Sequence, residues 1–160
     1  MSGRVVGLAE LDSELARARE EGKRVVLTNG CFDLLHPGHL SYLRRAREQG
    51  DLLVVGVNSD DSVRVLKGPG RPLVAEADRA GLLAALDPVD LVVIFPELRA
   101  DELLRAVRPD VYVKGGDYSP ETLPEAPTAA ELGADIRLLS FVPGYSTSGL
   151  IKRIRDGEGG

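Results

Sequence analysis

The sequence is poor in aromatic residues: it has no tryptophan, three phenylalanines and four tyrosines. Proteins that bind single-stranded nucleic acid stack bases on such rings, so this scarcity argues against that class. Basic residues are outnumbered by acidic ones, 20 to 25, and the formal charge of −5 argues against a general polyanion binder. We therefore expect no nucleic-acid partner, although basic side chains could still converge on a small phosphorylated substrate.

Cysteine and long apolar runs are also scarce. The one cysteine, Cys31, cannot form an internal disulfide, so the fold requires no oxidising compartment. No apolar run approaches the ~18 residues of a membrane span, and residues 1–22 lack the layout of a signal peptide. These absences predict a soluble cytoplasmic protein with no membrane partner.

The remaining composition is that of one globular domain of 160 residues, with 43% apolar and 28% charged residues. We expect a single domain over residues 1–160, with a core over about 24–156 and a frayed tail at 157–160. Continuous apolar runs predict buried strands at 24–28, 51–58, 91–95, 111–113 and 136–141. Helical spacing predicts helices at 8–18, 38–49, 60–66, 76–86, 99–107, 128–132 and 146–155. In the last helix, Leu150, Ile151 and Ile154 are expected to face inward.

Strands that alternate with helices predict an α/β fold. The expected architecture is a Rossmann-like, doubly wound, five-stranded parallel sheet with helices on both faces. Such sheets bind ligands beyond the carboxyl ends of their strands, where the strand order reverses. The residues that follow each strand are therefore the candidate site.

The segment after the first predicted strand, 28–39, holds both histidines of the chain, His36 and His39, around Pro37-Gly38. Gly38 permits close approach of a phosphate, and the free amides and dipole of a helix start attract anions. Both imidazoles could donate hydrogen bonds to phosphate oxygens. The alternatives are histidines that only cap the helix, or a zinc site with Cys31, which lacks a clear fourth ligand. Cys31 itself is more typical of a buried thiol than of a nucleophile.

Basic and small residues follow the other strands. Lys67 and Arg71 lie in a Gly/Pro loop, and Arg79 lies in the next predicted helix. Lys114 precedes Gly115-Gly116, whose glycines permit close backbone approach. Residues 146–148 open the last helix and are also good N-caps. The alternative for Lys67, Arg71 and Arg79 is solvated surface charge. The alternatives for the other two groups are a tight turn at 114–116 and simple N-capping at 146–148.

The run 30–39, GCFDLLHPGH, resembles the G-x-F-D-x-x-H-x-G-H signature of the cytidylyltransferase-like nucleotidyltransferases. The similarity extends from Val25 to Ile154. Within that superfamily, residues 57–60, 66–68, 70–72, Arg79 and 113–118 look most like the D-glycero-D-manno-heptose 1-phosphate adenylyltransferases, in their stand-alone form.

The resemblance implies transfer of AMP from ATP to a sugar 1-phosphate, with release of pyrophosphate. It implies Mg²⁺ bound through the triphosphate and no protein metal ligand. A homodimer is expected only because homodimers are the commonest assembly of soluble proteins. The resemblance assigns catalysis to His36, His39 and Lys67. It places the nucleotide at Asn29, Gly30, Cys31, Phe32, His36, Gly38, His39, Lys114, Gly115, Gly116, Asp117, Ser146, Thr147 and Ser148. It places the acceptor phosphate at Asp33, Asn58, Lys67, Arg71 and Arg79.

Two stretches depart from related patterns. Cytidylyltransferases that act on glycerol 3-phosphate carry Arg-Thr-Glu-Gly-Ile-Ser before the last helix, whereas residues 141–146 read FVPGYS, without the arginine. The stretch Ser119 to Pro127 also differs from the expected pattern, at a place where the acceptor could bind. A glycerol-3-phosphate or other alcohol-phosphate cytidylyltransferase and a non-catalytic nucleotide-binding regulatory domain are therefore the alternative functions.

Overall fold

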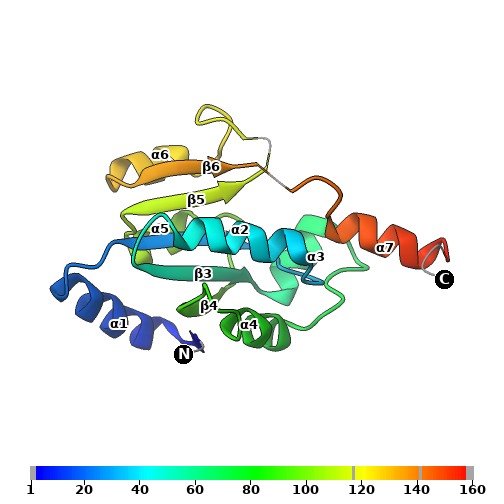
Figure 1. Cartoon of the computed structure of the whole chain (residues 1–160), viewed down its shortest axis with the longest axis horizontal. Coiled ribbons are helices and arrows are strands. Elements are labelled where there is room, and N and C mark those ends of the chain that lie inside the picture. The colour runs from blue at the N-terminus through cyan, green and yellow to red at the C-terminus, as the bar shows by residue number, and fades with distance from the viewer. Residues whose placement is uncertain (1–2, 117, 141, 158–160) are drawn as a thin grey trace.

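The computed structural model describes residues 3–116, 118–140 and 142–157. Within them, six strands form one parallel sheet in the order β1-β4-β3-β2-β5-β6 (Figure 1). The strands are β1 Arg4–Val5, β2 Val25–Gly30, β3 Leu52–Asn58, β4 Leu91–Phe95, β5 Val111–Gly115 and β6 Asp135–Leu139. The predicted doubly wound α/β architecture is confirmed.

Seven helices lie within the same residues. They are α1 Leu8–Glu20, α2 Pro37–Arg47, α3 Asp60–Lys67, α4 Glu76–Ala84, α5 Asp101–Val107, α6 Ala126–Glu131 and α7 Thr147–Arg155. None of these described helices combines the length and the apolarity needed to cross a bilayer.

The strand count differs from the prediction of five. The additional strand, β1, has two residues and pairs with β4 at the edge of the sheet, Arg4 opposite Leu91 and Val5 opposite Val92. A two-residue edge strand is too short to show an apolar run or an alternation, so only its pairing partner reveals it.

The helices cover the sheet in two layers. α1, α5 and α6 pack against one face, and α2 and α4 pack against the other. β2 shows how its side chains divide between the layers: Val25 and Leu27 belong to the first core, and Val26 to the second. Because both faces are covered, the central strands are apolar without interruption, as the sequence suggested.

The winding direction reverses between β2 and β5. From β2 the chain proceeds outward through β3 to β4, and β5 then returns to the other side of β2, with Val26 opposite Val111 and Leu27 opposite Tyr112. The loops that leave neighbouring strands in opposite directions open a crevice at this point. The candidate site is therefore expected at the carboxyl ends of β2 and β5.

The last helix is oriented differently from the prediction. Ile154 is 71% exposed, so the expectation that it faces inward is wrong, whereas Leu150 and Ile151 are half-buried but belong to neither core. Figure 1 shows α7 extending beyond the carboxyl ends of the strands. The helix is joined to the body at its first residue, where the Thr147 hydroxyl donates to the carbonyl of Asp33 at 2.7 Å. Helical spacing identifies an apolar face but not whether anything covers it.

Candidate active site

A cavity of about 770 Å³ opens at the carboxyl edge of the sheet. Its walls come from the segments after β2, β3 and β5 and from the start of α7, which brings together segments more than 100 residues apart in the sequence. The predicted site residues that line it are Asn29, Gly30, Cys31, Phe32, Asp33, His36, Gly38, His39, Asn58, Lys67, Arg71, Lys114, Gly115, Gly116, Ser146, Thr147 and Ser148. Arg79 does not line it, and Asp117 lies outside the described residues.

The two histidines form a capping box at the start of α2. Nδ1 of His36 accepts from the backbone N–H of Gly38 at 3.1 Å, and Nδ1 of His39 accepts from the backbone N–H of His36 at 3.2 Å. The ring centroids lie 3.9 Å apart. Capping and a functional role are therefore compatible, because the capping bonds also orient both rings at the cavity wall.

These bonds determine where each ring carries its proton. A backbone N–H can donate only to an unprotonated ring nitrogen, so both Nδ1 atoms are acceptors and the proton of each neutral ring is on Nε2. Burial lowers the pKa of His36, and burial together with the neighbouring His36 lowers the pKa of His39 to about 4. Both imidazoles are therefore neutral near pH 7 and offer one N–H donor each.

The position between the two histidines in the sequence, Gly38, requires a residue without a side chain. A β-carbon on Gly38 would lie 2.8 Å from Cε1 and 2.9 Å from Nδ1 of His36, and 3.0 Å from the β-carbon of Tyr145. Such contacts would displace the imidazole that accepts the Gly38 amide. The amides of this first turn are themselves occupied, since the Gly38 amide donates to His36 Nδ1 and the His39 amide donates to the carbonyl of His36 at 3.0 Å, so the predicted anion site at these amides is not open in the structure.

Four cationic side chains line the same cavity, although the chain as a whole is acidic. Lys67, Arg71 and Lys114 were predicted, and Arg99, from the loop after β4, was not. Burial lowers the pKa of Lys114, an effect that Lys67 reinforces and that Glu125 and Cys31 oppose. The predicted convergence of basic residues on one small site is thus observed, and it suits a ligand with several phosphate groups.

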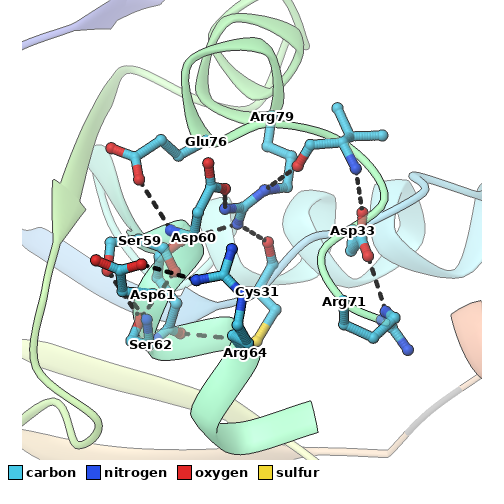
Figure 2. Close-up of polar contacts among 12 residues, drawn as sticks. Cys31, Asp33, Ser59, Asp60, Asp61, Ser62, Arg64, Arg71, Glu76 and Arg79 are labelled. Atoms are coloured by element: carbon cyan, nitrogen blue, oxygen red, sulfur yellow. Dashed lines mark hydrogen bonds and ion pairs between the residues drawn. The ribbon is translucent and has the colours of Figure 1, made fainter. Parts of the chain in front are cut away.

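Asp33 has a different role from the predicted acceptor contact. Its buried carboxylate accepts from Nε of Arg71 at 2.8 Å, a bond drawn in Figure 2. It also accepts from the amides of Leu73 and Val74 at 2.9 and 3.0 Å. Burial alone would raise the pKa of Asp33, but the two amides and Arg71 outweigh it and lower the pKa. Asp33 therefore holds the loop that carries Arg71, and Arg71 lies at the cavity because of it.

Arg79 also differs from its prediction as a phosphate ligand. It is 1% exposed, and Figure 2 shows its guanidinium surrounded by acceptors. It donates to the carbonyls of Val74, Cys31 and Asn58 at 2.8, 2.6 and 2.9 Å, and to Oδ1 of Asp60 at 2.7 Å. Arg79 thus joins the framework behind the site. Its sequence position in a helix gave no sign of this, because the acceptors lie in the loop after β2, at the end of β3, at the start of α3 and in the loop before α4.

The zinc alternative for Cys31 has no support in the geometry. Both histidine Nδ1 atoms are occupied by backbone amides, and the described residues contain no group of three or more side chains placed to hold a metal ion. Burial raises the pKa of the Cys31 thiol against the opposing effect of nearby Lys and Arg residues. Cys31 is therefore a protonated, half-buried thiol, as the sequence favoured over a nucleophile.

Several lining residues were missed by the sequence reasoning. They are Tyr42, Leu66, Leu98, Arg99, Tyr118, Pro124, Glu125, Val142 and Tyr145. Tyr118 adjoins the predicted Gly115-Gly116 loop and Tyr145 precedes the predicted Ser146 cap, so proximity to a motif could have found these two. Arg99 and Glu125 lie in loops whose relation to the site depends on the strand order.

The chain is similar to known proteins over most of its length. The family model described as cytidylyltransferase-like matches residues 27–153. The chain is 54% identical over 138 residues to the bifunctional protein HldE of Syntrophotalea carbinolica, which covers 86% of this chain and 28% of that protein. It is 51% identical over 155 residues to the protein of the same name in Geotalea uraniireducens, with coverage of 97% and 32%. The chain thus spans about a third of the length of these curated relatives.

A solved structure supports the same grouping. It is described as the lipopolysaccharide core biosynthesis protein from Thermoplasma volcanium, is 28% identical, and superimposes with a TM-score of 0.63 over 76% of this chain and 98% of that one. The family match includes the histidine signature, and the structure places those histidines at the cavity. The chain therefore belongs to the cytidylyltransferase-like family of nucleotidyltransferases.

Proposed function

We propose that the chain transfers AMP from ATP to a sugar 1-phosphate, giving an ADP-sugar and pyrophosphate. The observation that carries this proposal is the pair of neutral imidazoles at the start of α2, both with a free Nε2–H, in a cavity with four cationic side chains. Hydrogen-bond donors and fixed positive charge are what a triphosphate and a sugar phosphate require.

The acceptor is proposed to be D-glycero-D-manno-heptose 1-phosphate. This rests on the resemblance of residues 113–118 to the heptose enzymes, on the relatives named HldE, and on the structural neighbour described as a lipopolysaccharide core biosynthesis protein. The two relatives are about three times as long as this chain, so their whole activity does not transfer to it.

The proposed reaction is an in-line displacement. A phosphate oxygen of the acceptor attacks the α-phosphorus of ATP, a new P–O bond forms there, and the bond to the bridging oxygen of the β-phosphate breaks. The acceptor oxygen is already anionic, so no strong base is needed. His36 and His39 donate to the oxygens on which charge grows, while Lys67, Arg71 and Lys114 neutralise the phosphates.

Mg²⁺ is proposed to enter with the triphosphate, where it neutralises phosphate charge. The donor set fits this route better than a protein-held ion. The carboxylates among the described lining residues are Asp33, whose oxygens already accept three hydrogen bonds, and Glu125. Neither forms a cluster with other metal ligands in the described part of the chain.

The choice of nucleotide tests the proposal. We expect kcat/KM with heptose 1-phosphate to be about 10- to 10⁴-fold higher for ATP than for CTP, since each buried polar group left unpaired by the wrong base costs about 1–3 kcal/mol. The measurement is pyrophosphate release with ATP and CTP, first with heptose 1-phosphate and then with glycerol 3-phosphate. A CTP preference with either acceptor would establish the cytidylyltransferase instead, and nucleotide binding without pyrophosphate release would establish the regulatory domain.

A further inference from the structure

Glu125 is a buried carboxylate in the wall of the cavity that the proposed mechanism does not use. The residue lines the cavity and is 5% exposed. It immediately precedes α6, in the stretch Ser119 to Pro127 that departs from the expected family pattern. Carboxylates are rarely buried to this extent without partners, because removal of the charge from water is costly.

The segment around Glu125 is fixed to the start of α5 by three hydrogen bonds. Arg99 donates from Nη2 to the carbonyl of Pro124 at 2.7 Å, and the amide of Ala100 donates to Oε1 of Glu125 at 3.4 Å. The hydroxyl of Thr128 donates to Oδ1 of Asp101 at 2.6 Å. The backbone around Glu125 is therefore held by the fold, while one of its carboxylate oxygens has a contact of 3.4 Å to the Ala100 amide.

The second carboxylate oxygen of Glu125 has no partner. Among the described residues, no donor lies within hydrogen-bonding distance of Oε2, which is itself shielded from solvent. The charge nevertheless acts on the cavity, since it is the largest of the influences that raise the pKa of Lys114. An unpaired charge in this position lowers the stability of the free protein. Natural proteins retain such a group where a bound ligand supplies the missing hydrogen-bond donor.

The surroundings of Glu125 limit the chemical classes of ligand that could interact with its unpartnered oxygen. A phosphate group is disfavoured by like charge. A metal ion would need several oxygen ligands, and the described residues place no such group there. A neutral donor remains, and the proposed substrates carry hydroxyl groups on two sugar rings, the ribose of ATP and the sugar of the acceptor.

We propose that Glu125 binds the hydroxyl groups of a sugar ring through its unpartnered oxygen and so orients that ring with its phosphate toward Lys114 and the histidines. This rests on the proposed function and adds to it a residue that selects sugar-bearing ligands. A site built to accept from a hydroxyl discriminates strongly against ligands that lack it. The broad terminal torsion of a glutamate lets Oε2 turn toward the cavity when such a ligand enters.

The test is the equilibrium binding of ATP and of heptose 1-phosphate, measured separately by calorimetry, to the wild type and to Glu125→Gln. The variant keeps the side-chain shape and an oxygen for the Ala100 amide but removes the charge. Glu121→Gln, an exposed carboxylate on the same segment, is the matched control. We expect Glu125→Gln to bind one of the two ligands about 10- to 100-fold more weakly, which is the loss of one hydrogen bond to a charged group. Its melting temperature should be equal to or above that of the wild type, because the variant removes a charge that is unpaired in the free protein.

The arms of the experiment distinguish the two sugars. A loss confined to heptose 1-phosphate assigns Glu125 to the acceptor. A loss confined to ATP that disappears with 2′-deoxy-ATP or 3′-deoxy-ATP assigns it to the ribose. A loss of ATP affinity that persists with both deoxy analogues overturns the proposal. The proposal is also overturned if Glu125→Gln and a catalytically active wild type bind ATP with the same affinity and heptose 1-phosphate with the same affinity. Failure of the wild type to bind either ligand would instead overturn the proposed function itself.

Discussion

Replacement of Arg79 by alanine should lower the free energy of unfolding of this protein and should not remove a direct contact to phosphate. The guanidinium is 1% exposed and donates to three backbone carbonyls and to Asp60. Those acceptors belong to the loop after β2, the end of β3, the start of α3 and the loop before α4. Without Arg79, three carbonyls and a carboxylate lose a partner at once.

The expected loss follows from this arrangement. Removal of one partner of a buried charged pair costs about 3–5 kcal/mol. In a domain of this size, each 1 kcal/mol lowers the melting temperature by about 2–4 °C, so a fall of about 6–20 °C is expected. Arg79→Lys should recover only part of this loss, because one ammonium cannot reach acceptors on four segments.

The assay is urea or thermal unfolding of Arg79→Ala, with Arg71→Ala as the matched control. Arg71 lines the cavity and donates to Asp33, and Asp33 keeps the amides of Leu73 and Val74 as donors when Arg71 is removed. Arg71→Ala should therefore lower the free energy of unfolding less than Arg79→Ala and weaken the binding of phosphate ligands more. An Arg79→Ala variant with the melting temperature of the wild type and a raised KM for the substrates would refute the framework role and restore Arg79 as a ligand.

Two further predictions concern the catalytic assignment. We expect His39→Ala to lower kcat about 10²–10³-fold, through loss of an Nε2–H donor at the transferring phosphates, and to lower the free energy of unfolding by about 1 kcal/mol through loss of the capping bond to His36. Single-turnover kinetics and urea unfolding measure both, and a folded variant with the kcat of the wild type would exclude the role. We expect Lys67→Ala to lower kcat/KM with no change in melting temperature, because Lys67 is exposed and carries little folding energy. The control is Lys152→Ala, which replaces an exposed lysine on α7. Equal kcat/KM values for the two variants would show that Lys67 is a solvated surface residue with no role in the reaction.

Most of the local structure was predictable from the sequence because it depends on neighbours along the chain. The run 91–95 is β4 with the predicted bounds, and α3 and α7 begin after Ser59 and Ser146, whose hydroxyls accept amides of the first turn. The histidine pair was found for the same reason. Its spacing of three residues places both rings on the first turn of one helix, and the capping box they form is a local contact.

The tertiary structure alone decided which polar side chains form the site and which form the framework. Arg71 and Arg79 were both predicted as phosphate ligands, yet Arg79 is enclosed by four acceptors and Arg71 lines the cavity. The difference arises because three of the acceptors of Arg79 lie in the loop after β2, at the end of β3 and at the start of α3, which only the fold brings to this helix. Arg99 and Glu125 reach the cavity only because β4 and β5 end at the same edge of the sheet. Ile154 lies at helical spacing from Leu150 and Ile151 but is exposed. Periodicity in the sequence defines an apolar face of a helix, whereas only the packing of distant elements covers that face.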